Sequence, residues 1–483
     1  MTNLKNKSIS SAKWNLLANT GQYFFTFFLS IVLSRMITPA EFGLTSMLTI
    51  FISISTLLVG SGLSLALIRD KNASKEDFTT VFYFNVGISL ILYFTLFFCA
   101  PLIADFYNQA ELIGLTRWIS LVFVINSVGM IQNTILLINL DFRKQTIINI
   151  SGLFISVIIS IIMALKGFGV YSIVAQTLSQ ALFVNLFLWA SSTWRPEGFF
   201  NITSFKKLWK YSSNILVTGI FNTVMINVDN LIIGKIFRPH ILGLYTRAKS
   251  TKAIPELIFV NVLNTTSFSI LSKIHDDITQ FRQKHMLFFK ISVYFIFPFV
   301  VVFSLCSSHL IQLLYGDKWM SAVDYLVIIS YASIPNFLAA LFAQTILGYG
   351  NSKMYMKMNI IKSFLTIFTI PFGLFFGLKP YLYSFVIISF LGLIVDIFFT
   401  SQIIGTKKMD YLEMMVKPII FSVIMFVMIV LCQYFIDFGN IINLFIEVIL
   451  GLGIYIVLLN FAAKEIFNYF IEFFQSFLKK RIS

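Results

Sequence analysis

The chain has 483 residues, of which 58% are hydrophobic and only 12% are charged, and its mean hydropathy is +0.85. These values exclude a soluble globular protein and are typical of an integral membrane protein. The net charge of +15 does not indicate a nucleic-acid partner, because the basic residues are scattered singly among the predicted loops instead of lining one face.

Apolar windows of about 20 residues recur along the chain, which is the length of a membrane-spanning helix and not of a barrel strand. We therefore predict an all-α polytopic membrane protein with about 14 transmembrane helices. In chain order, the predicted helices lie at about 14–37, 44–68, 80–104, 114–140, 148–165, 171–191, 211–236, 244–272, 288–313, 325–349, 358–376, 381–404, 418–436 and 441–461. The tail, 464–483, predicts an amphipathic helix on the inner leaflet.

Lysine and arginine are concentrated in alternate connections between the predicted helices and in both tails. The positive-inside rule places these connections in the cytoplasm. We therefore expect a multi-pass protein with both termini cytoplasmic.

Ionisable and polar residues are unusually frequent in the predicted helices 211–236 and 244–272. A charged side chain at mid-bilayer costs roughly 2.5–3.5 kcal/mol, so such residues usually face a bundle interior or a water-filled cavity. At helical spacing, the second helix presents one stripe of Lys249, Lys252, Glu256, Asn264 and Ser267, with Arg247 nearby. The first presents Asn214, Thr218, Asn222 and Asp229, and ends near Lys235. This hairpin is the candidate working site; the alternative for Arg247 and the lysines is snorkelling to the interface.

The first predicted helix has its own polar stripe and ends at a basic residue, Arg35. The stripe consists of Asn15, Asn19, Gln22, Thr26 and Ser30. We expect it to face a cavity or a partner helix, where the alternative role of such residues is interhelical hydrogen bonding.

Motifs for catalysis or metal binding are absent from the sequence. There is no GxxxxGK(S/T) phosphate loop and no HExxH motif, and the longest connection, of about 20 residues, is too short for a soluble catalytic loop. The three cysteines lie in apolar runs without CxxC spacing, which predicts packing roles. The four histidines, His240, His275, His285 and His309, are dispersed near predicted helix ends or loops, and we expect them at interfaces. We therefore predict that the chain is not an enzyme and has no catalytic residue, metal or cofactor.

The two halves of the chain are related by an internal repeat. Arg35, Pro39, Gly43 and Leu44 align without a gap with Lys235, Pro239, Gly243 and Leu244. Proline ends or kinks a helix and glycine frees the following turn. We expect the basic pair, Arg35 and Lys235, at the outer mouth of the cavity; the alternative is that both side chains snorkel to the interface. Six helices per repeat imply two bundles related by an axis along the membrane normal. The predicted domains are an N-lobe at 1–200, a C-lobe at 201–410, two extra helices at 411–463 and the tail.

Three runs carry a resemblance to a known family: Pro39–Met47, Gly60–Arg69 and Gly243–Ala248. They resemble the polysaccharide-transporter branch of the multidrug/oligosaccharidyl-lipid/polysaccharide (MOP) flippase superfamily, most closely the colanic-acid-exporter type of Wzx flippase. The resemblance covers nearly the whole chain. It implies a flippase of the bacterial cytoplasmic (inner) membrane that moves undecaprenyl-diphosphate-linked oligosaccharides, of the O-antigen, lipopolysaccharide, capsule or exopolysaccharide type, to the outer leaflet by alternating access.

The resemblance also implies a cationic cavity. By position, Lys249 and Lys252 match that role, and Arg247, Arg35 and Lys235 are further candidates. The expected polar lining consists of Asn15, Asn19, Gln22, Asn222 and Asn264. Asp229, Glu256 or Asp396 could couple a proton or sodium ion, and the membrane potential is the other source of driving force.

The expected partners are the lipid-linked oligosaccharide, the membrane, and the polysaccharide polymerase and export machinery, without nucleic acid. The alternatives are a cation-coupled multidrug exporter and a flippase of the peptidoglycan lipid precursor. A membrane glycosyltransferase, polymerase or ligase is a third, which the short loops disfavour.

Overall fold

The computed structural model describes residues 25–60, 62–435 and 439–469. In this part of the chain the secondary structure is helical, and 13 helices are long and apolar enough to cross a membrane. They correspond to the second to fourteenth predicted helices. The described part of the first is the helix Phe25–Met36. The predicted all-α polytopic fold is confirmed.

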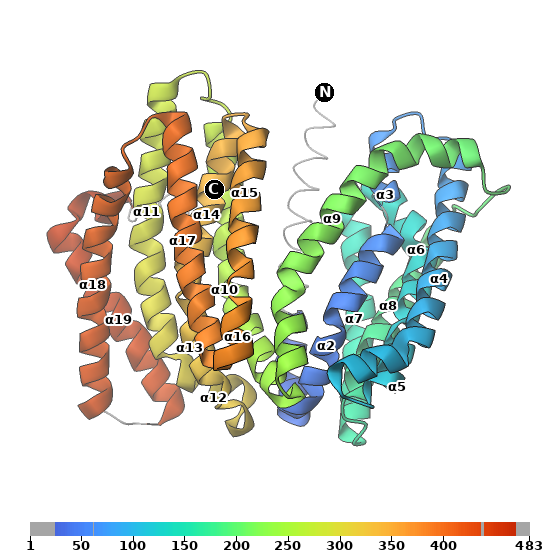
Figure 1. The fold of residues 1–483 in the computed structure, drawn as a ribbon, viewed down its shortest axis with the longest axis horizontal. Helices are drawn as coiled ribbons and strands as arrows, with labels where there is room; N and C mark the ends of the chain where they lie inside the picture. The colour runs from blue at the N-terminus through green and yellow to red at the C-terminus, as the bar shows by residue number, and fades with distance from the viewer. Residues whose placement is uncertain (1–24, 61, 436–438, 470–483) are drawn as a thin grey trace. The chain divides into compact units, whose positions relative to one another are not determined.

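The helices form two compact units, Met1–Gly243 and Leu244–Ser483. The division falls after α9 (Ile202–Ile236), because this helix packs along α2 (Pro39–Gly60) and also contacts α4 (Lys75–Tyr107) (Figure 1). The predicted lobes, divided at residue 200, follow the internal repeat and not these contacts. They stay a prediction.

Helices of the first unit pack closely at glycine residues. Its other labelled helices are α3 (Leu63–Arg69), α5 (Leu112–Ile119), α6 (Leu121–Ile138), α7 (Phe142–Leu165) and α8 (Tyr171–Ser191). A Cβ added to Gly129 of α6 would lie 1.8 Å from the side-chain oxygen of Asn185 on α8. A Cβ on Gly152 of α7 would lie 2.5 Å from Val184, also on α8. Small residues therefore let α8 pack closely against both neighbours, as is common between membrane helices.

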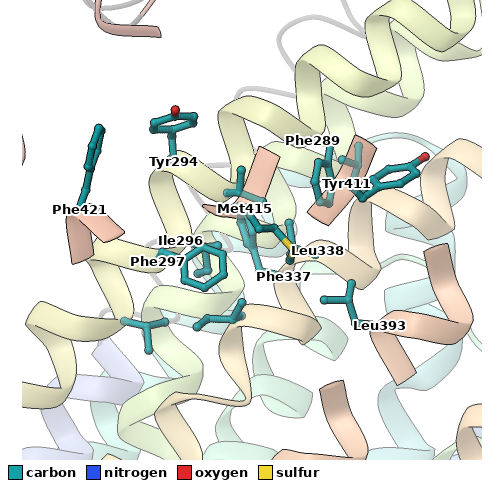
Figure 2. Close-up of a cluster of buried hydrophobic side chains, with 14 of the residues drawn as sticks. Phe289, Tyr294, Ile296, Phe297, Phe337, Leu338, Leu393, Tyr411, Met415 and Phe421 are labelled. Atoms are coloured by element: carbon teal, nitrogen blue, oxygen red, sulfur yellow. The ribbon is translucent and has the colours of Figure 1, made fainter. Parts of the chain in front are cut away.

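The second unit is built around α11. Its elements are most of α10 (Pro239–Leu271), α11 (Ile278–Leu305), α12 (Ser307–Tyr315), the 3-10 helix η1 (Asp317–Trp319), α13 (Ala322–Ser330), α14 (Ser333–Gly348), α15 (Ser352–Ile367), α16 (Ile370–Phe376), α17 (Leu378–Ile404), α18 (Lys408–Phe435) and α19 (Asn440–Ala462). α11 packs against α14 and α18. Figure 2 shows part of the resulting core, in which Phe289 of α11 lies near Tyr411 of α18.

Several helices begin earlier than hydropathy predicts, because polar caps start them outside the apolar window. Asn201 caps α9 by accepting from the backbone N–H of Thr203 (2.8 Å), and Asp277 caps α11 in the same way. Ser74 and Asp77 form a capping box at the start of α4. Such caps satisfy N–H groups that the helix leaves free, so the helix extends past the membrane-spanning part.

The extended start of α9 is held by an ion pair outside the spanning segments. Lys207 Nζ lies 2.6 Å from Asp70 Oδ2, and it also contacts Asp77 at 3.3 Å. The hydrogen bond from Lys207 lowers the pKa of Asp70, and the same bond raises the pKa of Lys207. This pair ties the end of α3 to the start of α9.

Other predicted helices are divided in the structure, although their sequences are apolar without interruption. The second predicted helix divides into α2 and α3, and the fourth divides at Ser120 into α5 and α6. Further breaks separate α11 from α12, α13 from α14, and α15 from α16. A sliding hydropathy average does not report backbone direction, so breaks between equally apolar segments escape it. Of the predicted tail helix, residues 464–469 are described and helical, and Ile466 is buried against the core of the second unit.

Candidate functional site

Lys252 is the most enclosed cation of the predicted stripe on α10. Its side chain is 10% exposed, and its Nζ lies 3.4 Å from Glu256 Oε2, one helical turn later. Four-residue spacing places the two charges on one face. An ion pair this enclosed has lost most of its hydration, so removing Lys252 would leave the carboxylate of Glu256 without this partner, at high cost. Lys249, on the same stripe, is half-buried.

The Lys252–Glu256 pair borders a small cavity in the second unit. The cavity has a volume of about 10 Å³, and its other walls are mostly apolar, including Phe259, Phe299 and Phe337. This is room for roughly one water. The cavity can therefore hydrate the pair but cannot hold a sugar.

Farther along α10 the stripe meets α14. The side-chain oxygen of Asn264 accepts a hydrogen bond of 3.2 Å from Gln344 Nε2. Ser267 is buried and donates to the carbonyl oxygen of Leu263 in its own helix. Gln344 was not among the predicted site residues, although a glutamine within an apolar helix is a signal that could have identified it.

Arg247 occupies a different environment from the stripe. It is only 5% exposed, and its guanidinium carbon lies 4.9 Å from the ring centre of Tyr315 and 5.1 Å from that of Trp319. The Tyr315 hydroxyl also forms a 2.9 Å hydrogen bond with Thr251. Arg247 neither snorkels to the surface nor extends the lysine stripe, because the aromatic rings hold its cation inside the second unit. Its role in cargo binding stays a prediction.

The predicted residues on α9 divide between buried and exposed positions. Asp229 is 7% exposed and accepts a 2.9 Å hydrogen bond from the backbone N–H of Asn230, whereas Asn222 is exposed. Lys235 is exposed, donates to the carbonyl oxygen of Phe106 and lies 4.5 Å from that residue's ring centre. These contacts hold the amine at the end of α4, and the role of Lys235 in cargo binding stays a prediction.

The remaining predicted residues belong to the first predicted helix. Arg35 is exposed. The polar candidates Asn15, Asn19 and Gln22 lie outside the described residues.

A buried ion pair between α15 and α17 was only half anticipated. Lys362 Nζ lies 2.7 Å from Asp396 Oδ1, and the side chain of Asp396 is 1% exposed. Asp396 was a coupling candidate, but its partner was missed. The available signal was a lysine well inside an apolar segment, which predicts an acidic partner on a neighbouring helix.

His285 corrects the expectation that the histidines lie at interfaces. It is fully buried in the second unit, where Nδ1 lies 2.8 Å from Thr345 Oγ1 and Nε2 lies 2.9 Å from the Tyr411 hydroxyl. Its position near the predicted start of a helix was misleading, because α11 begins ten residues earlier, at Ile278. The hydroxyl partners allow a polar ring to remain in the core.

Known proteins match this chain in sequence and in fold. A family model described as "Polysaccharide biosynthesis protein" matches residues 32–324. The lipopolysaccharide biosynthesis protein WzxC of Escherichia coli (strain K12) is 23% identical over 372 residues, covering 77% of this chain and 76% of that protein. The teichuronic acid biosynthesis protein TuaB of Bacillus subtilis (strain 168) is 23% identical over 434 residues, covering 88% and 89%.

Among solved structures, lipid II flippase MurJ in an inward closed conformation has a TM-score of 0.73 at 16% identity, covering 92% of this chain and 97% of that one. This likeness shows the fold. The sequence matches confirm the resemblance inferred from the residues.

Proposed function

The chain belongs to the polysaccharide biosynthesis protein family, and from this premise we propose that it is a flippase for lipid-linked oligosaccharides. Its cargo is an undecaprenyl-diphosphate-linked repeat unit, which it moves from the cytoplasmic to the outer leaflet by alternating access. The observation that carries the proposal is the family match from 32 to 324, which includes the lysine stripe of α10. Sequence relatives named for lipopolysaccharide and teichuronic acid biosynthesis support this class of cargo.

The α10 stripe has the chemistry that such a head group requires. A diphosphate is bound by cationic donors, and Lys249 and Lys252 supply two on one helix face. Sugars are bound by amide and hydroxyl groups, which Asn264 and Ser267 provide farther along the same helix. We place the diphosphate at the two lysines in preference to Arg247, whose cation is held between aromatic rings.

Outward movement of the head group requires a source of free energy. A charge that crosses 100 mV changes in free energy by about 2.3 kcal/mol, so two negative charges moving outward gain roughly 4–5 kcal/mol from an inside-negative potential. Asp229 and Glu256 are our candidates for additional coupling to a proton or a sodium ion. We further propose that the protein lies in the bacterial cytoplasmic membrane with both termini inside, and that polymerase and export machinery receive its product.

The test measures leaflet accessibility of a fluorescent undecaprenyl-diphosphate oligosaccharide in proteoliposomes. The test variant is Lys249→Ala/Lys252→Ala/Glu256→Gln, in which the third change avoids an unpaired buried carboxylate. Glu256→Gln alone isolates the effect of the carboxylate. The matched control for lost charge is Lys273→Ala/Lys284→Ala, which removes two exposed lysines.

Four results are informative. Flipping by the wild type and by Lys273→Ala/Lys284→Ala, but not by the lysine variant, is expected, and Glu256→Gln alone should flip faster than the lysine variant. Flipping retained in the lysine variant would keep the function and move the diphosphate elsewhere, with Arg35 and Lys235 tested next. If the wild type moves no lipid-linked sugar but lowers cellular sensitivity to cationic drugs, the proposal is wrong and the multidrug exporter replaces it. Activity on the peptidoglycan precursor alone would instead identify that lipid as the cargo.

A further inference from the structure

The proline and glycine matched by the internal repeat lie at equivalent places in two helices. Pro39 is the first residue of α2 and Pro239 is the first residue of α10, and each glycine follows four residues later. All four residues belong to the first compact unit. From the sequence, each glycine was expected to allow a turn after its proline. In the structure both glycines lie within a helix and neither has a positive φ. A different reason for glycine is therefore needed.

The structure provides that reason as a reciprocal backbone contact. A Cβ added to Gly43 would lie 1.8 Å from the carbonyl oxygen of Pro239, and a Cβ added to Gly243 would lie 1.7 Å from the carbonyl oxygen of Pro39. Real Cβ atoms essentially never come so close to another atom. Each repeat thus supplies one glycine and one carbonyl, and each glycine hydrogen points at the carbonyl of the other repeat. We name these four residues the Pro–Gly crossing.

The chemistry of the crossing suits a contact that forms and breaks. It joins backbone groups, and the Cα–H···O interactions involved are individually weak. The close approach nevertheless demands glycine, because the obstructing atoms are backbone and cannot move aside as a flexible side chain would. The α2 side is fixed by a capping box, in which Thr38 N–H and Oγ1 donate to Glu41 at 2.8 and 2.7 Å. The α10 side begins instead at Arg238 and Pro239, directly after α9.

We propose that the Pro–Gly crossing is a reversible clasp, which closes the starts of the two repeats against each other in one state of the transport cycle and opens in another. Gly43 and Gly243 are its positioning residues. The proposal rests on the alternating-access function given above. The positive-inside pattern puts this end of both helices outside, so the clasp controls the outward-open state.

The test uses a cysteine-free protein, with Cys99, Cys306 and Cys432 replaced, carrying the reporter Leu44→Cys. Leu44 is 4% exposed and adjoins Gly43, so it is shielded in the closed state. A membrane-impermeant maleimide added outside cells measures how often the site opens. The variants are Gly43→Ala, Gly243→Ala and both together. The matched control is Gly87→Ala on α4, where an added Cβ would meet no atom of the described chain within 4 Å.

We expect each single variant to raise the labelling rate by between about fivefold and a hundredfold, the population change that overpacking typically imposes. The labelling rate of the double variant should rise by less than the product of the two single-variant increases, because both changes open the same contact. Flipping should fall in all three, and Gly87→Ala should match its parent in labelling and flipping.

Two results would overturn the clasp. One is labelling of Gly43→Ala and Gly243→Ala at the rate of Gly87→Ala. The other is failure of both variants to fold, judged by monodispersity on size exclusion, while Gly87→Ala folds, because the crossing would then be a permanent part of the unit. Labelling requires no cargo, so the expected labelling without any lipid-linked sugar transport would support the clasp and refute the proposed function alone.

Discussion

The buried ion pair between α15 and α17 gives a prediction whose size follows from the structure. Lys362 Nζ lies 2.7 Å from Asp396 Oδ1, with side-chain exposures of 23% and 1%. Lys362→Met keeps the length of the side chain and removes its charge, which leaves the carboxylate of Asp396 in an apolar surrounding. The expected loss is about 3–5 kcal/mol in the free energy of unfolding, as for other buried pairs that lose one partner.

Protonation of Asp396 sets an upper limit on this loss. The carboxylate can avoid being buried unpaired by taking up a proton, and a free carboxyl in water is half protonated at about pH 3.9. Protonation at pH 7 then costs about 4 kcal/mol, and this cost falls by about 1.4 kcal/mol for each pH unit. The destabilisation by Lys362→Met should therefore shrink to about 1.5 kcal/mol at pH 5. Lys362→Met/Asp396→Leu, which removes both charges, should be close to the wild type in stability.

The assay is equilibrium unfolding in mixed detergent micelles at pH 7 and pH 5, arranged as a double-mutant cycle. The matched control is Lys379→Met, because Lys379 also lies 2.7 Å from a carboxylate, that of Asp324, but both side chains are more than half exposed. Its removal should have little effect. Additive losses from the two single changes, with no pH dependence, would refute the reasoning. Retained flipping by the double variant would also remove Asp396 from ion coupling.

Three further predictions use the same unfolding assay. Gly129→Ala should lower the free energy of unfolding by about 1–3 kcal/mol, because its Cβ would lie 1.8 Å from the side chain of Asn185. An unchanged free energy of unfolding would mean that α8 can move away from α6 without loss. Asp70→Asn should lower the unfolding temperature at pH 7, because the hydrogen bond from Lys207 lowers the pKa of the Asp70 carboxyl. The stability that this carboxylate contributes is complete above about pH 3.9 and is lost as the pH falls through the lowered pKa. The difference in unfolding temperature from the wild type should therefore close below about pH 4 and not on the alkaline side. Arg247→Lys should destabilise the second unit through lost stacking on two rings, and an equally stable lysine variant would show that charge alone is needed there.

The sequence was sufficient for the class of fold and for most helix positions. Transfer of an apolar side chain into lipid depends on the residue itself, so windows of hydropathy locate spans without knowledge of their neighbours. The thirteen spans of the described chain match the predicted ones in order. The extended starts of α9 and α11 were missed because polar caps, and not lipid, determine where those helices begin.

The candidate site was predictable in part. The stripe of Lys252 and Glu256 follows from helical spacing, and the structure brings the two side chains together as that spacing requires. Arg247 was a further candidate for the cationic cavity, outside the stripe, and packing directs it toward Tyr315 and Trp319. Helical periodicity gives the face of a residue but not the neighbour that the face meets.

The sequence by itself determined that this is a polytopic helical membrane protein built from repeats and carrying cations in its spans. Only the tertiary structure decided which groups those cations contact, as for Lys362 with Asp396, and that Gly43 and Gly243 meet the opposite repeat's prolines. The physical reason is that burial in lipid is a property of single segments. Ion pairs and backbone approaches depend on the rotation and distance of two helices that are far apart in the chain.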